Sequence, residues 1–201
     1  MIVKICGITH LNDAQAAIAG GASALGFNFY PRSKRYIGIS DATKMIAQLP
    51  SDIVKVGVFV NESAERVADL VQRIGLDVAQ LHGDETPEQY PAGVRVWKAA
   101  HVDDAFTLAA WDACPAEALL LDSPANGDFG GSGQSFDWSR AAGGSRQIIL
   151  AGGLDESNVR EAIRLVKPWG VDACSRIERA PGRKDHAKMA AFIQAVLEAS
   201  A

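Results

Sequence analysis

The sequence contains few cysteines, no long basic stretch and no long apolar segment. Its three cysteines, Cys6, Cys114 and Cys174, are too few and too far apart for a disulfide framework or for paired Cys/His metal ligands. No apolar run reaches the roughly 20 residues that cross a bilayer, and no signal-peptide pattern stands at the start of the chain. We therefore expect a cytoplasmic protein with free thiols, no bound metal and no membrane partner.

The charge argues against a nucleic-acid partner. The 201 residues carry a formal net charge of −4, whereas nucleic-acid binding requires a basic face or stripe. The one locally basic stretch, PRSKRY at 31–36, is too short to follow a phosphate backbone and suits a single small anion. With 48% hydrophobic and 22% charged residues, the composition is that of an ordinary globular protein with a substantial core.

Short β-rich runs alternate with helical patterns along the whole chain. Helix-like apolar stripes occur at Val67–Ile74, Val159–Val166 and Met189–Leu197, each with the spacing of one buried face. The β-rich runs lie at 2–7, 24–30, 54–60, 77–83, 95–100, 118–123, 147–153 and 170–175. Eight strand–helix units predict a single α/β domain over 1–201, a (β/α)8 TIM barrel. An open doubly wound sheet is the alternative, although it usually has fewer strands.

Polar residues at the ends of these runs are the candidate catalytic groups, because TIM barrels place their chemistry at the carboxyl ends of the strands. Cys6 ends the first run, where a free thiol could also be a buried inert side chain. Asp122 follows three leucines and is either a helix-capping partner or an acid with a raised pKa. His82 has no second metal ligand at suitable spacing, so we expect a substrate-contacting or structural histidine.

Two glycine-rich segments could bind an anion. Gly152 and Gly153 precede a predicted helix that begins within 155–158, where backbone N–H groups could approach a phosphate. The second segment, NGDFGGSGQSFDW, covers 126–138. Either could equally be a tight turn. Neither is a nucleotide motif: GGSGQS lacks the lysine of a P-loop, and no G-x-G-x-x-G follows the first run.

Several motifs, in order along the chain, resemble those of the phosphoribosylanthranilate isomerases of tryptophan biosynthesis. They are KICGIT at 4–9, FNFYPRSKRYI at 27–37, VGVFVN at 56–61, QLHGDE at 80–85, LLLDS at 119–123, GGSGQSFDW at 130–138, ILAGGLDESNV at 149–159 and PGRKD at 181–185. The resemblance covers essentially the whole chain.

The resemblance implies an Amadori rearrangement of a phosphosugar–anthranilate substrate that needs no cofactor. It implies that Cys6 is the general base, that Asp122 is the general acid and that Arg35 holds the anthranilate carboxylate. It also implies further substrate-binding residues, namely His82, Gly131, Ser132, Gly152, Gly153, Ser175 and Arg176. A monomer and a homodimer both remain open.

The chain departs from the family pattern in the expected phosphate region. Cys174-Ser175-Arg176 stands where Ser-Ser-Gly is common, and Gln134 stands where lysine is frequent. We expect Arg176 to turn away, so that main-chain donors bind the phosphate. The alternative is that the guanidinium of Arg176 reaches the phosphate. Arginine in place of the family's glycine would strain the backbone if this position needs a positive φ.

Three other functions fit parts of the pattern. The related aldose–ketose isomerase of histidine biosynthesis carries an aspartate at the end of its first strand, so Cys6 argues against it. A phosphosugar-binding barrel without catalysis should have lost Cys6 or Asp122, and both are present. A thiol-redox role for Cys6 is weaker, because no resolving cysteine lies near it in the sequence.

Overall fold

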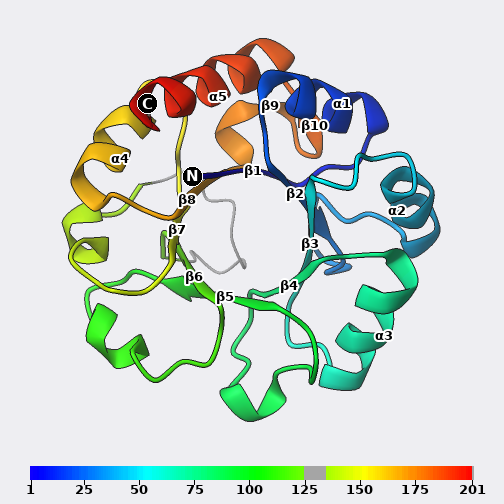
Figure 1. Cartoon of the computed structure of the whole chain (residues 1–201), viewed down its shortest axis with the longest axis horizontal. Helices are drawn as coiled ribbons and strands as arrows, with labels where there is room; N and C mark the ends of the chain where they lie inside the picture. Colours follow the sequence, from blue (N-terminus) through cyan, green and yellow to red (C-terminus); the bar gives the residue numbers. More distant parts are fainter. Residues whose placement is uncertain (125–134, 201) are drawn as a thin grey trace.

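The computed structural model describes residues 1–124 and 135–200, and its centre is a closed barrel of eight parallel strands (Figure 1). β8 pairs with β1, with Ile2 opposite Gly170 and Ile5 opposite Ala173. The strands are β1 (Ile2–Cys6), β2 (Ala24–Asn28), β3 (Val54–Phe59), β4 (Val78–Leu81), β5 (Val96–His101), β6 (Ala118–Asp122), β7 (Ile148–Leu150) and β8 (Gly170–Ala173). This closure confirms the predicted barrel and excludes the open sheet.

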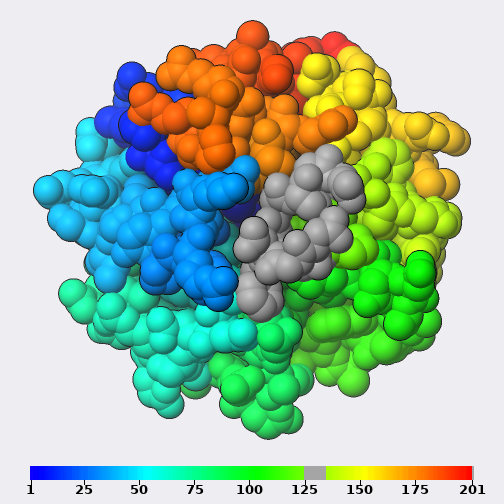
Figure 2. Space-filling view, turned by 180° about the vertical axis from the view of Figure 1, so that it is seen from behind, coloured from blue at the N-terminus to red at the C-terminus, as the bar shows by residue number. Residues whose placement is uncertain are grey.

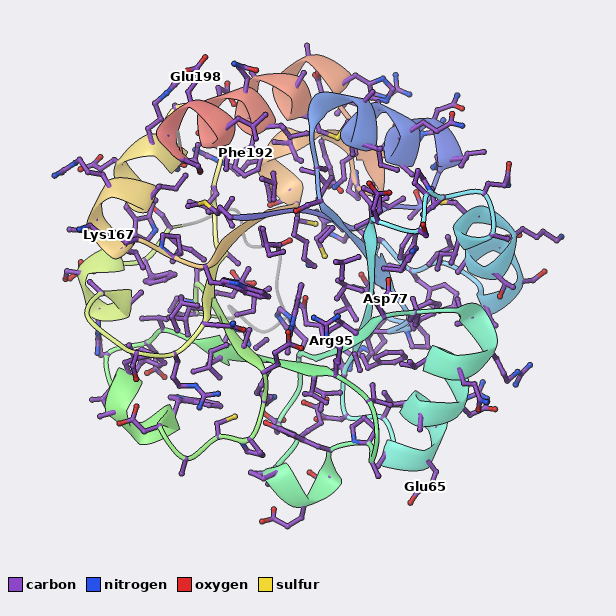
Figure 3. The ribbon with its side chains drawn as sticks, viewed as in Figure 1. Glu65, Asp77, Arg95, Lys167, Phe192 and Glu198 are labelled. Carbon is purple, nitrogen blue, oxygen red and sulfur yellow. The ribbon has the colours of Figure 1, made fainter. Side chains whose placement is uncertain are left out.

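Helices surround the barrel (Figure 1). They are α1 (Leu11–Gly20), α2 (Ile39–Ile46), α3 (Ala64–Ile74), α4 (Val159–Val166) and α5 (His186–Ser200). The last three contain the apolar stripes seen in the sequence. In Figure 3, Phe192 points from α5 toward the barrel, whereas Glu198 points outward. No helix in the described part of the chain is long and apolar enough to cross a membrane.

A helix does not follow every strand, which corrects the prediction of eight strand–helix units. Short 3-10 turns, η1 (Pro87–Gln89) and η2 (Leu108–Trp111), take the place of an α-helix after β4 and β5. Pro87 and Pro91 explain the first case, because proline lacks a backbone N–H and interrupts a helix. Further 3-10 turns are η3 (Trp138–Ala141) and η4 (Ser175–Ile177); a small hairpin, β9 (Glu178–Ala180) with β10 (Arg183–Lys184), follows η4.

Successive side chains of each strand point alternately to the barrel interior and to the surrounding helices. On β1, Val3 and Ile5 belong to the apolar layer between barrel and helices, so Lys4 and Cys6 face the barrel interior. A second apolar cluster fills one end of this interior and includes Trp97, which packs edge-on against Trp169 at 5.7 Å. The other end of the interior is left to polar side chains.

Candidate active site

Residues from six strands or the loops after them line one cavity at the carboxyl end of the barrel. The lining residues are Cys6, Asn28, Ser33, Arg35, Val58, Val60, Gln80, His82, Asp122, Asp172 and Cys174. Four of the residues predicted from the sequence are therefore together: Cys6, Arg35, His82 and Asp122. On the face shown in Figure 2, the light-blue segment after β2 meets the orange segment after β8 at this site.

Cys6 is held between neighbouring strands with little free space. It lies opposite Gly26 of β2, and a Cβ atom built on Gly26 would lie 2.7 Å from Cys6 Sγ and 3.1 Å from Lys4 Nζ. Glycine at this position therefore lets the thiol and the ammonium group share one small volume. Lys4 is fully buried, and its Nζ donates to Asp172 Oδ1 at 2.8 Å.

The ionisation of Cys6 is linked to that of Cys174. A hydrogen bond with Cys174, burial and the negative charge of Asp172 raise the pKa of Cys6, while the positive charge of Lys4 lowers it. The hydrogen bond from Cys6 and the positive charges of Lys184 and Arg35 lower the pKa of Cys174 to about 7 against the effect of burial. The first proton to leave therefore belongs to the pair of thiols rather than to Cys6 alone.

Asp122 ends β6 and is buried. Burial, together with the nearby negative charge of Asp172, raises its pKa, although Ser123 donates to Oδ1 from its backbone N–H at 2.8 Å and from its hydroxyl at 3.3 Å. Of the two possibilities for this carboxyl group, the environment favours an acid with a raised pKa.

His82 lies between Gln80 and Asp122. Its Nδ1 is 2.9 Å from Gln80 Nε2, and its Nε2 is 3.7 Å from Asp122 Oδ2. Burial and the neighbouring charges of His101, Lys4 and Lys98 lower the pKa of His82 to about 3, so the ring is neutral at pH 7. Within the described residues, His82 Nε2 and Gln80 Oε1 have no hydrogen-bond partner. No group of three His, Cys, Asp or Glu residues in that part of the chain could hold a metal ion.

Arg35 reaches the cavity from the loop after β2 but already binds a carboxylate. Its Nε lies 3.0 Å and 3.1 Å from the two carboxylate oxygens of Glu178, and its Nη2 lies 2.8 Å from Oε2. Lys184 Nζ also donates to Glu178 Oε1, at 2.9 Å. The hairpin that follows η4 thus supplies the group that orients Arg35.

The predicted phosphate-binding segments after β7 and β8 line a second, smaller cavity beside the first. Its walls include Gly152, Gly153, Ser175 and Arg176. Gly152 has φ 76°, and a Cβ atom there would lie 2.8 Å from Ser123 N, so this position requires glycine. The predicted residues Gly131 and Ser132, and the Gln134 departure, lie outside the described residues.

Arg176 pairs with a carboxylate at the rim of the second cavity. Its Nη2 lies 2.7 Å from Asp155 Oδ2. Arg176 lies in η4, and its φ is not positive. The backbone at this position therefore does not favour glycine, and the concern over strain does not apply.

Sequence reasoning missed four groups that shape the site: Lys4, Gln80, Asp172 and Glu178. The first three carry a weak signal, because each stands on a strand two residues before a cavity residue that lies at the end of that strand or directly after it, and side chains two residues apart share a face. Glu178 carries none, because its pairing with Arg35 joins residues 143 positions apart.

Comparisons with known proteins match nearly the whole chain. A family model described as N-(5'phosphoribosyl)anthranilate (PRA) isomerase matches residues 3–195. The N-(5'-phosphoribosyl)anthranilate isomerase of Solibacter usitatus is 54% identical over 195 residues, covering 97% of this chain and 96% of the relative.

Solved structures are similar as well. A crystal structure of phosphoribosyl anthranilate isomerase in complex with reduced 1-(o-carboxyphenylamino)-1-deoxyribulose 5-phosphate has 38% identity and a TM-score of 0.84. Monomers generated from the dimeric phosphoribosylanthranilate isomerase of Thermotoga maritima have 38% identity and a TM-score of 0.85. In both cases the match covers 98% of this chain and 100% of the other.

Proposed function

The chain belongs to the N-(5'-phosphoribosyl)anthranilate isomerase family, and we propose that it catalyses the Amadori rearrangement of N-(5-phosphoribosyl)anthranilate with Cys6 as general base and Asp122 as general acid. The product is 1-(2-carboxyphenylamino)-1-deoxyribulose 5-phosphate, an intermediate of tryptophan biosynthesis. One observation carries the assignment: a thiol from the end of β1 and a carboxyl group from the end of β6 line the same cavity.

The reaction needs one acid and one base. Protonation of the furanose oxygen opens the ring and leaves a protonated Schiff base; removal of the proton from C2 of the ribose then gives an enolamine that tautomerises to the ketone. A raised pKa suits Asp122 to the first step, because the carboxyl group must carry a proton to donate. A thiolate at Cys6 suits the second step, and Lys4 supplies a positive charge that stabilises it.

Three further groups would bind the substrate. Arg35 uses Nε and Nη2 for Glu178, which leaves Nη1 to meet the anthranilate carboxylate. His82, held neutral, presents Nε2 toward the cavity beside Asp122. The phosphate would bind main-chain N–H groups of Gly152 and Gly153 and of the turn at 175–176, together with the predicted donors Gly131 and Ser132. Arg176 would stay with Asp155.

Turnover of N-(5-phosphoribosyl)anthranilate, followed by the loss of anthranilate fluorescence, tests the proposal. Cys6→Ala and Asp122→Asn should each lower kcat by about 100-fold or more, the scale for loss of a positioned proton-transfer group, with little change in KM. If a variant keeps most of its turnover, the residue replaced in it is not the proposed acid or base. Turnover of the histidine-pathway substrate alone would favour the related isomerase, and no turnover of either would favour a binding protein.

We propose a monomer or a homodimer, since a dimeric relative has the same fold. Sedimentation equilibrium on the purified chain would distinguish the two.

A further inference from the structure

Two buried polar atoms of the main cavity have no hydrogen-bond partner among the described residues. They are His82 Nε2 and Gln80 Oε1, and both side chains line the cavity together with Asp122. A buried donor or acceptor without a partner lowers stability, so native proteins retain such atoms mainly where a ligand pairs with them. These two atoms therefore mark a part of the cavity that is built to bind a polar group.

Gln80 determines which ring nitrogen of His82 carries the proton. Its amide Nε2 lies 2.9 Å from His82 Nδ1, and an amide nitrogen donates hydrogen bonds but does not accept them. Nδ1 must therefore accept with its lone pair, so the ring is neutral and its one N–H is at Nε2. The unpartnered atom of His82 is thus a hydrogen-bond donor.

A buried lysine holds the backbone on both sides of His82. Lys98 of β5 lies opposite Leu81 of β4, and its Nζ donates to the backbone oxygens of Leu81 and Gly83. Glu85 pairs with Lys98 Nζ at 2.9 Å and accepts from Gly83 N at 3.0 Å. Both side chains are almost fully buried, and neither lines the two cavities of the site. The pair therefore fixes the chain that carries His82 rather than meeting a ligand itself.

The donor of His82 lies beside the free oxygen of Asp122. Ser123 donates to Asp122 Oδ1 from its backbone N–H and from its hydroxyl, which leaves Oδ2 to carry the proton of the acid. His82 Nε2 and Asp122 Oδ2 are 3.7 Å apart. One substrate oxygen can lie next to both atoms and accept a hydrogen bond of ordinary length, about 2.8 Å, from each.

We propose that His82 Nε2–H and Asp122 Oδ2–H together bind the furanose oxygen of the substrate, and that Gln80 and Lys98 are positioning residues that hold His82 for this contact. This inference rests on the proposed function, in which Asp122 is the acid.

Ring opening assigns a separate part to each donor. The lone pair of the anthranilate nitrogen becomes the second bond of C=N, the bond from C1 to the furanose oxygen breaks, and that oxygen takes the proton of Asp122. His82 keeps its own proton throughout. Its N–H stabilises the negative charge that grows on the oxygen as the bond breaks, because a fixed donor aimed at developing charge lowers the barrier.

Nitrogen-15 NMR of protein labelled at the histidine side chains tests the tautomer without substrate. The His82 signals, assigned by their loss in His82→Asn, should show a protonated Nε2 and an unprotonated Nδ1 at pH 7. His101 is the internal control, because its Nδ1 lies 3.0 Å from the backbone oxygen of Ser123, an acceptor, and should carry a proton. In Gln80→Glu, a carboxylate replaces the donor, so a proton should appear on His82 Nδ1. A protonated Nδ1 in the wild type would overturn the role of Gln80.

Two replacements of His82 test the donor in catalysis. The amide nitrogen of glutamine can reach the position of Nε2, whereas the shorter side chain of asparagine cannot. His82→Asn should lower kcat by about 100-fold, the scale for loss of one donor at a developing charge, and His82→Gln should lower it less. Equal losses in the two variants would contradict a donor at Nε2.

A double-mutant cycle tests whether one oxygen contacts both groups. His82→Asn should lower kcat much less in the Asp122→Asn background than in the wild type, because residues that act together on one step have non-additive effects. Independent, additive losses would overturn the shared oxygen.

The positioning role of Lys98 needs variants that still fold. Lys98→Met leaves Glu85 unpaired, so Lys98→Met/Glu85→Gln, which lacks the buried charge, is measured beside it. Both should lower kcat and shift the nitrogen-15 signals of His82. The control is Lys55→Met, another buried strand lysine, which should leave both unchanged. Lower stability with unchanged kcat and unchanged His82 signals would show that Lys98 is only structural.

The proposed function and this inference can fail separately. If Asp122→Asn loses turnover but His82→Asn keeps it, Asp122 remains the acid and the role of His82 is wrong. If Asp122→Asn keeps most of its turnover, the acid assignment fails and the shared oxygen fails with it.

Discussion

At the scale of single residues, the site depends on charges that are paired within the protein before substrate binds. Arg35 is held by Glu178, Lys4 is held by Asp172, and Arg176 is held by Asp155. Each pairing fixes a long side chain that would otherwise lose rotamer freedom when substrate binds.

Arg35→Ala should mainly raise KM for the anthranilate substrate, with a smaller effect on kcat. The side chain of Arg35 lines the cavity, and its pairing with Glu178 through Nε and Nη2 leaves Nη1 free to donate to the substrate carboxylate. Arg32, an exposed arginine in the same loop, is the control, and Arg32→Ala should leave KM nearly unchanged. Steady-state kinetics give KM for both variants. Equal changes in KM would show that Arg35 does not bind the substrate.

Lys4→Met should shift the acid limb of the kcat/KM profile to higher pH. The positive charge of Lys4 lowers the pKa of Cys6, so its loss raises that pKa and the thiolate forms only at higher pH. The control is Lys55→Met, because Lys55 is also a buried strand lysine beside an aspartate, Asp77 at 3.6 Å, and lines neither of the two cavities of the site. A profile that moves equally in both variants, or in neither, would contradict the assignment.

At the scale of elements, the closely packed strands leave room for the side chains of the cavity where a residue on the neighbouring strand is small. Gly26 of β2 is the clearest case, because Cys6 and Lys4 occupy the space above it. After β4 and β5, 3-10 turns stand where an α-helix was expected, yet the strands still pair in order. Strand pairing, rather than a helix after every strand, therefore defines the barrel.

Gly26→Ala should lower both stability and kcat. An added Cβ would lie 2.7 Å from Cys6 Sγ, and overpacking of a core typically costs about 1–3 kcal/mol. The control is Gly38→Ala at the start of α2, where the new Cβ would lie 3.7 Å from Asp41 Oδ2 and φ is −67°. Urea unfolding and kcat of both variants provide the measurement. If Gly26→Ala is as stable and active as Gly38→Ala, the packing at β2 is looser than described.

At the scale of the whole molecule, the first and last strands close the barrel through backbone pairing and the buried pair of Lys4 and Asp172. The ring of His82 lies among these buried groups, and burial keeps it neutral. Such a group links the stability of the entire fold to pH.

The free energy of unfolding should fall as the pH drops below about 6.5, the usual pKa of histidine in an unfolded chain. The pKa of His82 in the folded protein is about 3, so between these values the unfolded chain binds a proton that the folded one does not. Stability therefore rises with pH in this window, by at most about 1.4 kcal/mol per pH unit from this residue.

His82→Gln should reduce this slope, and His10→Gln, at an exposed position, should not. Urea unfolding from pH 4 to 7 measures the slope, and identical slopes for the wild type and His82→Gln would show that His82 is protonated in the folded state. The comparison between variants matters more than the absolute slope, because other buried groups also titrate.

Local patterns in the sequence were enough to predict the barrel and to place three of the cavity residues at strand ends. Strand runs, helical stripes and their order depend on neighbours in the chain, so periodicity was enough to place Cys6, His82 and Asp122 at carboxyl ends of strands. The expectation that Arg176 need not bind the phosphate stays a prediction, although its pairing with Asp155 supports it.

The pairing of charged side chains from distant parts of the chain could not be predicted from the sequence. Lys4 and Asp172 are 168 positions apart, and Arg35 and Glu178 are 143 apart. Cys6 and Cys174 likewise line one cavity only because β8 pairs with β1. Barrel closure brings the two ends of the chain together, and burial then raises or lowers the pKa values of the groups that meet. Local patterns in a single sequence record neither the contacts nor the burial, and both set the chemistry of the site.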